Sequence, residues 1–373
     1  MPAGHPDPRL SVTGSRVVSA IAQFGLVDED VSVSYDEVRS EFEAIVDVCE
    51  EERLLGALAW FVVSRGWQLE AGDVGALTDR YVIWLARSLD VERLAVKIDE
   101  IFTREGLDYR VMKGVALSRL AYRDPSLRVF GDLDILVRSD EIDRAATVVS
   151  ECLGGQRIEP SIRPGFTKEF GKDITLRIGD LELDIHRSFA AGPFGLRMCQ
   201  DDLFSETTPA EVGGVNLPAL GPLGLLLSAC FGASIGDYPQ KIGPLRDLAL
   251  LAARWPEYLT RVADVAVRWR IEAVVQDAAA SAIHVLGLPE SHPLVALRVE
   301  RAPLIQRVYL RTYHTSGRGY WRELAGVVAV RGVSARLRYA KALLVPSAVY
   351  LQQRGWTRWA YVRAVLSRMW GSE

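Results

Sequence analysis

Cysteine and histidine are both scarce in this 373-residue chain, and neither is clustered. The four cysteines lie far apart and form no C-x-x-C pair. This spacing argues against a zinc ribbon and against a disulfide framework, and it favours a reducing, cytoplasmic setting. The five histidines are scattered as well. We therefore expect any metal ion in this protein to be held by oxygen ligands.

Long apolar runs, internal repeats and low-complexity tracts are also missing. No stretch reaches the ~18–20 apolar residues that a membrane-spanning helix needs, and residues 1–15 lack the apolar segment of a signal peptide. With 49% hydrophobic and 25% charged residues, the composition is that of a globular protein. The length favours two or three packed units.

Charge is unevenly distributed along the chain. The formal net charge is −4, yet residues 301–373 carry 13 lysines and arginines against two acids. Residues 1–300 are left with 31 basic and 46 acidic side chains. The basic segment therefore favours either an anionic partner or pairing with the acidic remainder of the chain.

The spacing of apolar residues divides the chain into parts. We expect a flexible tail over 1–16, a helical region over 17–90, a mixed catalytic core over 91–190, and a helical region with the basic tail over 218–373. In the core, short strands at 109–112, 128–137, 174–178 and 181–186 alternate with helices, and Gly179-Asp180 forms a hairpin turn. This order predicts an α/β (α+β) fold with a small mixed sheet flanked by all-α regions.

Capping residues predict two helix starts. Thr78-Asp79 precedes a helix over 81–89, which is separate from a second helix over 91–104. Ser139 is expected to cap the helix that ends at Gly154-Gly155.

The segment Asp132-Leu133-Asp134-Ile135 places two carboxylates on one face of a strand, about 6.5–7 Å apart. Like charges at that distance raise each other's pKa unless a cation lies between them. A divalent metal ion with oxygen ligands would fill that role. The alternative is a strand end at which both aspartates simply face water.

A third carboxylate follows in the strand over 181–186. Asp184 and His186 alternate with apolar residues, so Asp184 completes a three-carboxylate cluster if this strand lies beside the first one. Two magnesium ions held by such carboxylates suit an in-line displacement at phosphorus. Glu182 is expected to be a flanking charge, and His186 either contacts substrate or metal or packs on the sheet.

Lys113-Gly114 lies where a strand runs into a helix. A helix N-terminus offers free N–H groups, and glycine allows close approach of the backbone to a phosphate. Lys113 would add a point charge and Arg128 a planar fork. The alternatives are a solvated loop lysine at 113 and a structural pair of Arg128 with Asp124.

Together these motifs resemble the DNA polymerase β-type nucleotidyltransferase superfamily, and more narrowly they are similar to an uncharacterised bacterial nucleotidyltransferase family. The resemblance is strongest over residues 107–190. It implies transfer of a nucleoside monophosphate, first of all AMP, from ATP or another NTP to an acceptor with release of pyrophosphate. Two Mg²⁺ ions are the implied cofactors, with Mn²⁺ as the alternative.

The resemblance also implies roles for single residues. Asp132 and Asp134 would bind both metal ions, while Asp184 would hold one of them and act as base toward the acceptor hydroxyl. Gly114 would approach the triphosphate. Three further side chains complete the predicted nucleotide-binding set, namely Lys113, Arg128 and His186.

Three positions depart from, or bear on, the family pattern. Val115 follows Gly114 where the superfamily usually has serine or glycine, which removes one hydroxyl donor to phosphate. Cys230-Phe231 stands where the narrower family often has a histidine. Arg246-Asp247 falls where that family tends to keep an aspartate, and we expect a helix-packing salt bridge there.

Two rival functions and an open acceptor follow from these features. Val115 favours a catalytically inactive nucleotide-binding or scaffold protein, and the basic C-terminal helices favour an RNA-acting nucleotidyltransferase. The acceptor is a small molecule, a peptide or an RNA. In the last helix Trp359, Val362, Leu366 and Met369 share a stripe, which predicts packing on the protein itself; nucleic-acid or membrane-surface binding are the alternatives.

Overall fold

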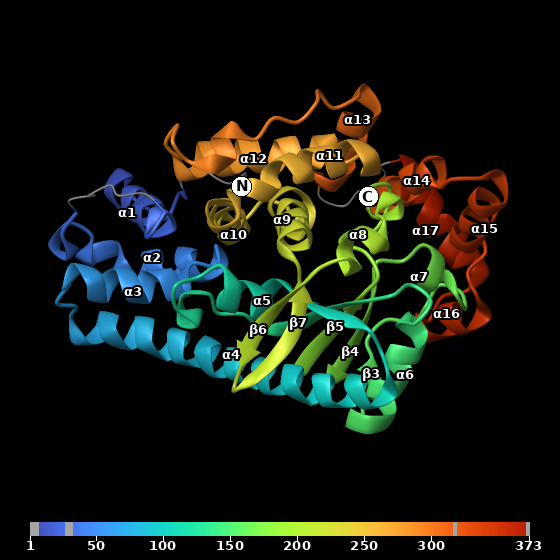
Figure 1. Ribbon diagram of the computed structural model, residues 1–373, viewed down its shortest axis with the longest axis horizontal. Coiled ribbons are helices and arrows are strands. Elements are labelled where there is room, and N and C mark those ends of the chain that lie inside the picture. The colour runs from blue at the N-terminus through green and yellow to red at the C-terminus, as the bar shows by residue number, and fades with distance from the viewer. Residues whose placement is uncertain (1–6, 27–32, 316–318, 371–373) are drawn as a thin grey trace.

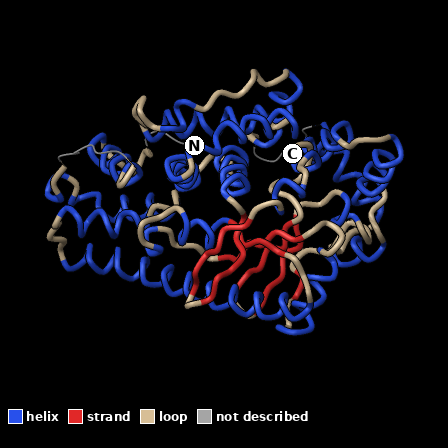
Figure 2. Tube along the Cα trace, in the orientation of Figure 1, coloured by secondary structure: helices blue, strands red, loops and turns tan. Residues whose placement is uncertain are grey.

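A seven-stranded mixed sheet lies at the centre of the computed structural model, which describes residues 7–26, 33–315 and 319–370 (Figures 1 and 2). Its strand order is β3-β4-β5-β2-β1-β7-β6. The pairs β2–β5 and β1–β7 are parallel, and the other neighbours are antiparallel. The strands are β1 (Tyr109–Met112), β2 (Asp132–Val137), β3 (Gln156–Arg157), β4 (Asp173–Ile178), β5 (Leu181–His186), β6 (Thr207–Val212) and β7 (Val215–Leu220).

The described part of the N-terminal region contains three shorter α-helices and one long α-helix, α4. They are α1 (Val12–Gln23), α2 (Phe42–Glu51), α3 (Leu55–Arg65) and α4 (Ala71–Glu105). Figure 1 shows α4 running beneath both these helices and the sheet. The predicted helix start at Thr78-Asp79 is wrong, because no glycine or proline interrupts residues 76–105 and one 35-residue helix spans both predicted segments.

The predicted tail over 1–16 is also wrong in part. Residues 1–6 lie outside the described residues, but α1 already begins at Val12. Its start is defined by Ser11, whose hydroxyl accepts a hydrogen bond from the backbone N–H of Gly14 (3.1 Å).

One face of the sheet is apolar and covered by helices. Leu133, Ile135 and Val137 are fully buried on it, as their alternation with the aspartates predicts, and α4 and α6 (Ile142–Leu153) pack there. The expected cap at Ser139 is wrong. Its backbone N–H and hydroxyl instead donate to the side-chain oxygen of Gln200 (2.8 and 2.9 Å), so α6 begins three residues later.

The hairpin β6–β7 extends the sheet beyond residue 190, past the predicted end of the core. Its strands each contain a proline, and Pro209 lies opposite Pro218 in the register. Proline removes a backbone donor and disfavours a strand assignment, which explains why the pattern did not predict this hairpin. β6 is an edge strand, where a missing donor is tolerated.

The C-terminal helices form two groups. The first layer covers the sheet region from above in Figure 1 and comprises α9 (Pro222–Phe231), α10 (Ile242–Arg254), α11 (Leu259–Trp269), α12 (Glu272–Leu286) and α13 (Leu304–Tyr313). The second group is α14 (Gly319–Ala329), α15 (Val333–Leu344), α16 (Ala348–Gln353) and α17 (Arg358–Trp370). The short helices are α5 (Lys113–Leu120), α7 (Phe166–Glu169) and α8 (Gln200–Phe204). In the described parts of the chain, no helix combines the length and apolarity required to cross a membrane.

The second group has a small core of its own. Val330, Tyr339 and Leu343 pack against Phe170, which follows α7, so α14 and α15 lie against the loop between β3 and β4. The predicted packing stripe of α17 is wrong at Trp359, which is 83% exposed; Leu366 and Met369 lie outside the described side chains. Tyr361 is buried instead, since its hydroxyl donates to the carbonyl of Leu343 (2.6 Å).

A buried ion pair ties the first helical layer to the sheet. The guanidinium of Arg128, in the loop before β2, donates to both carboxylate oxygens of Asp247 in α10 (3.1–3.2 Å), and the hydroxyl of Tyr122 donates to the same carboxylate (2.6 Å). All three residues are buried. Asp247 thus forms a helix-packing salt bridge as expected. The alternative pairing of Arg128 with Asp124 is wrong, because the Asp124 carboxylate accepts hydrogen bonds from Ser126 instead.

Removing one charge of this pair is expected to be costly. Asp247→Asn should lower the free energy of unfolding by about 3–5 kcal/mol, because it leaves the Arg128 guanidinium buried without a counter-charge. Urea denaturation measures the change. The double variant Arg128→Met/Asp247→Leu should recover most of the loss, and Asp90→Asn, which breaks an exposed pair with Arg93, should leave the unfolding midpoint unchanged. An unchanged midpoint for Asp247→Asn would contradict this account.

Candidate active site

The second face of the sheet carries polar side chains on three neighbouring strands, here called the polar face. β2 and β5 pair in parallel with Asp134 opposite Asp184, and β4 pairs with β5 so that Thr175 lies opposite Asp184 and Asp173 opposite His186. The condition for a carboxylate cluster, that β5 lies beside β2, is therefore met. Alternation along each strand keeps these side chains on one face.

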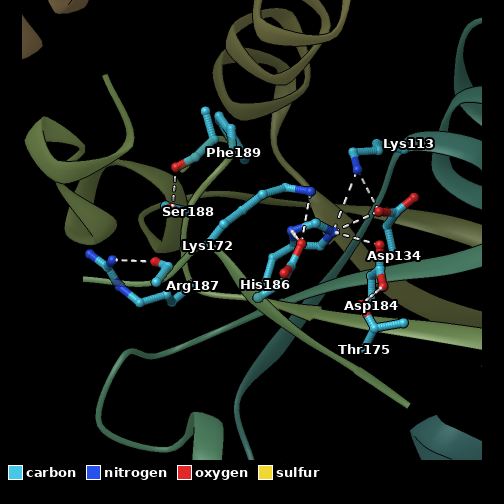
Figure 3. Close-up of polar contacts among 12 residues, drawn as sticks. Lys113, Asp134, Lys172, Thr175, Asp184, His186, Arg187, Ser188 and Phe189 are labelled. Atoms are coloured by element: carbon cyan, nitrogen blue, oxygen red, sulfur yellow. Dashed lines mark hydrogen bonds and ion pairs between the residues drawn. The ribbon is translucent and has the colours of Figure 1, made fainter. Parts of the chain in front are cut away.

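Asp134 contacts both Lys113 and His186 (Figure 3). One of its oxygens, Oδ1, lies 2.5 Å from Nζ of Lys113 and 2.6 Å from Nε2 of His186. Asp134 and His186 are buried, whereas Lys113 is partly exposed. Burial opposes ionisation of Asp134, but the Lys113 ammonium and the His186 hydrogen bond outweigh it and lower the pKa of this carboxyl. Asp134 is thus held as an anion.

Asp184 completes a set of candidate metal ligands with Asp134 and His186. One ligand atom from each of the three lies within 4.8 Å of the others. Ligand atoms around one Mg²⁺ or Mn²⁺ ion lie at most about 4–4.5 Å apart, so the set fits one divalent ion after small adjustments. The hydroxyl of Thr175 donates to Oδ1 of Asp184 (2.6 Å), which leaves Oδ2 facing His186 (4.0 Å). His186 adds a nitrogen to the oxygen ligands that the sequence predicts.

Asp132 lies at the exposed outer end of β2, next to this set. Partial desolvation and the neighbouring Asp134 carboxylate raise the pKa of Asp132, and Lys113 opposes that rise. Asp132 therefore lies within electrostatic range of the cluster without belonging to the three closest ligands. Glu182 is opposite Asp132 in the register and pairs with Arg177 (3.2 Å), as a flanking charge would.

Lys113 occupies an unusual backbone conformation. Its φ of 49° lies in the left-handed region, which costs a residue other than glycine about 1–2 kcal/mol. Strain of this size is retained where the surrounding structure uses the residue. Although burial opposes it, the adjacent Asp134 raises the pKa of the Lys113 ammonium, so this residue supplies a fixed positive charge to the polar face. The alternative of a solvated loop lysine is wrong.

Gly114 and the side chain of Val115 face the protein interior at the start of α5. A Cβ atom on Gly114 would lie 2.7 Å from Cγ of Phe130, so the packing of α5 on that ring requires glycine. Val115 is only 1% exposed. The side chain that departs from the superfamily pattern is therefore part of the core. Approach of the Gly114 backbone to a triphosphate remains a prediction.

Arg128 is not brought into the cluster. Its guanidinium is buried against Asp247, as described above, and a third donor is used by the carbonyl of Val129 (2.7 Å). Its predicted role as a phosphate-binding fork would require this ion pair to open.

Sequence reasoning missed three charged residues around the polar face. Asp173 lies 3.6 Å from Nδ1 of His186 and pairs with Lys172 (2.7 Å). Asp173 and Thr175 alternate with the apolar Ile174, and this pattern is the signal in the sequence that could have indicated Asp173. Arg53, in the turn between α2 and α3, lies within electrostatic range of Asp132 and acts to lower its pKa. No local pattern indicates Arg53, because it comes from the N-terminal region.

The mixed sheet, with two carboxylates beside a lysine at a strand-to-helix junction, fits the nucleotidyltransferase class that the family match indicates. Residues 39–287, more than half of the chain, match the uncharacterised nucleotidyltransferase family. The chain belongs to this family. Membership implies an NTP substrate and a divalent metal ion. No curated protein matches the chain.

Two solved structures are similar to the chain at low identity. The antibiotic-resistance factor ANT(2'')-Ia is 18% identical, with a TM-score of 0.37, over 51% of this chain and 97% of that one. An antigenic nucleotidyltransferase-like protein from Paracoccidioides brasiliensis is 15% identical, with a TM-score of 0.31, over 51% and 92%.

Removing the Lys113 ammonium should strengthen metal binding in the absence of nucleotide. In Lys113→Met, Mn²⁺ no longer competes with an ammonium for Oδ1 of Asp134, so its affinity should rise by about tenfold. Asp134→Asn should weaken Mn²⁺ binding by at least as much. Electron paramagnetic resonance of free Mn²⁺ measures both, with Glu182→Gln as the matched control that leaves the affinity unchanged. Equal affinities for the wild type, Lys113→Met and Asp134→Asn would contradict the assignment.

Proposed function

We propose that the polar face is the active centre of a metal-dependent nucleotidyltransferase that moves a nucleoside monophosphate from an NTP to an acceptor and releases pyrophosphate. The convergence of Asp134, Asp184 and His186 carries this proposal. Membership of a nucleotidyltransferase family supports it. AMP from ATP is the first donor to test.

The proposed metal ligands are Asp134 and Asp184, with Asp132 as the third carboxylate at the outer end of β2. Bound Mg²⁺ or Mn²⁺ would neutralise charge on the triphosphate and lower the pKa of the acceptor hydroxyl. Nε2 of His186 donates a hydrogen bond to the ionised Asp134 carboxylate (2.6 Å) and orients it.

Asp184 is the proposed base for the acceptor hydroxyl. Thr175 engages one of its oxygens, so the other is the oxygen available to take the proton. The acceptor oxygen then forms a bond to the α-phosphorus while the bond from that phosphorus to the pyrophosphate oxygen breaks. The hydroxyl proton passes to Asp184, and the electron pair of the broken bond leaves with pyrophosphate.

Positive charge for the triphosphate comes from two sides of the polar face. Lys113 approaches from the start of α5, and Arg53 approaches from the N-terminal helices. We assign the phosphate contacts to these two residues rather than to Arg128 because the Arg128–Asp247 pair is buried. Lys113 and Arg53 are partly exposed, so each can exchange its present partner, Asp134 or Asp237 (3.0 Å), for a phosphate. The backbone N–H groups at the start of α5 add further donors.

A pocket of about 690 Å³ adjoins the polar face and is the proposed acceptor site. Asp173, Thr175 and Glu182 of the polar face line one wall, and the far wall comes from α14, α16 and α17 with the segment between them. The volume suits a small molecule. Trp356 and Tyr350 offer ring faces on the far wall.

The charges of this pocket favour a small polar acceptor over RNA. Its charged lining side chains are four carboxylates and three arginines: Glu159, Asp173, Glu182, Glu323, Arg157, Arg322 and Arg354. A balanced set of this kind does not attract a polyanion. We therefore propose a hydroxyl-bearing, neutral or zwitterionic small molecule as the acceptor.

The transfer itself is tested with α-labelled NTPs, Mg²⁺ and cell extract as the source of acceptor. The wild type should form a labelled product, and Asp134→Asn or Asp184→Asn should lower its rate by at least about a hundredfold, because the variant cannot hold the metal ion. Glu211→Gln, which removes an exposed carboxylate on the edge strand β6 outside the pocket, is the control that should retain activity. If the wild type and Asp134→Asn behave alike and bind Mg²⁺–NTP equally, the protein is an inactive binding or scaffold module.

The acceptor site is tested with Trp356→Ala. Loss of the ring should lower transfer to the low-molecular-mass fraction of the extract by about three- to tenfold, while binding of Mg²⁺–ATP stays unchanged. Trp359→Ala is the matched control, because that indole is exposed and lies outside the pocket. Labelling confined to the RNA fraction would contradict the small-molecule assignment and favour the RNA-acting alternative.

A further inference from the structure

A cavity of about 520 Å³ lies apart from the residues of the polar face, where three separate segments each contribute an arginine. Arg197 ends the short 3₁₀ turn Gly195–Arg197, Arg270 caps the C-terminus of α11, and Arg336 lies in α15. The remaining wall is largely apolar, with Val267, Ile305 and Val328 among its side chains. We call this cavity the arginine pocket.

The arginines of this pocket have no acidic partner among the residues that the structure describes. Two other arginines of α11 do have acidic partners: Arg261 pairs with Glu206 (2.8 Å), and Arg268 pairs with Asp202 (2.9 Å). The one carboxylate on the wall, Glu272, is buried and accepts a hydrogen bond from the side-chain amide of Gln306 (2.6 Å). Three arginines against this one carboxylate leave the pocket with an excess of positive charge.

The guanidinium of Arg336 is held by hydrogen bonds, and that of Arg197 is partly buried near other positive charges. Arg336 donates to the backbone carbonyls of Val330 (2.8 Å) and Val328 (3.4 Å). These bonds hold its guanidinium against the residues that precede α15. Burial, followed by the nearby charges of Arg270, Arg331 and Arg336, lowers the pKa of Arg197. Like charges are thus close enough to repel one another, and a bound anion would relieve that repulsion.

Arg270 is a costly choice for its backbone position. It has a φ of 57° at the end of α11, a left-handed conformation that glycine adopts without strain and other residues adopt at a cost of about tenfold in the local equilibrium. Glycine would cap this helix better. An arginine retained here indicates that the side chain has a role beyond ending the helix.

We propose that the arginine pocket binds a small phosphorylated molecule, with a phosphate or diphosphate group between Arg197, Arg270 and Arg336 and an uncharged part against the apolar wall. Guanidinium forks match phosphate oxygens in two-point hydrogen bonds. The partly apolar, bounded cavity favours a compact ligand over a nucleic-acid backbone. This site is separate from the catalytic proposal and does not depend on it.

Inorganic pyrophosphate is the probe, titrated calorimetrically into the full-length chain in the presence of EDTA, which removes metal-dependent binding at the polar face. Arg197→Gln and Arg270→Gln should each weaken pyrophosphate binding by about tenfold. Arg268→Gln, two residues from Arg270 but already ion-paired, is the matched control and should bind as the wild type does. Lys113→Met, which removes a proposed phosphate contact of the polar face, should also bind normally, and this result separates the two sites.

A second variant separates binding from folding. Arg270→Gly removes the guanidinium but relieves the left-handed strain, so it should weaken pyrophosphate binding while raising the thermal unfolding temperature. The proposal is overturned if pyrophosphate does not bind the wild type, or if Arg197→Gln and Arg270→Gly bind it as tightly as the wild type. It is also overturned if only a single-stranded RNA oligonucleotide binds and pyrophosphate does not compete with it.

Discussion

The parallel pairing of β2 with β5 is the constraint on which the candidate site depends. It sets Asp134 opposite Asp184 and brings His186 within 2.6 Å of the Asp134 carboxylate, although these residues are about fifty positions apart in the chain. A shift of one residue in this register would turn the carboxylates of one strand into the apolar core beneath the sheet. The buried alternate residues, such as Leu133 and Ile185, therefore maintain the geometry of the polar face from below.

Charge balance at Asp134 is the second consequence of this pairing. A buried carboxylate needs compensation, and here an ammonium and an imidazole supply it at the oxygen that a metal ion would use. The left-handed backbone of Lys113 belongs to this balance, because it is the junction from which the ammonium reaches Asp134. The polar face is thus arranged for cations in general, and its affinity for a metal ion depends on how strongly Lys113 competes.

How much of this could be predicted from the sequence depends on the range of the interaction. Alternation along single strands predicts the hairpin and the shared face of Asp132 and Asp134, because those properties are local. The partner of Arg128 could not be predicted, because Asp247 comes from a helix more than a hundred residues later. Val115 departs from the usual pattern of a phosphate-binding turn. Its burial could not be predicted from the neighbouring sequence, because burial depends on tertiary packing.

Both cavities are lined by residues of the family match together with residues that follow it. The family match ends at residue 287, and it includes every strand and every proposed metal ligand. Residues beyond 287 build the far wall of the pocket beside the polar face, through Trp356 and its neighbours, and they bring Arg336 to the arginine pocket. The helices α14 and α15 share a small separate core with Phe170 of the loop between β3 and β4. The proposed chemistry therefore lies in the family region, whereas each of the two pockets combines residues of that region with residues of the helices that follow it.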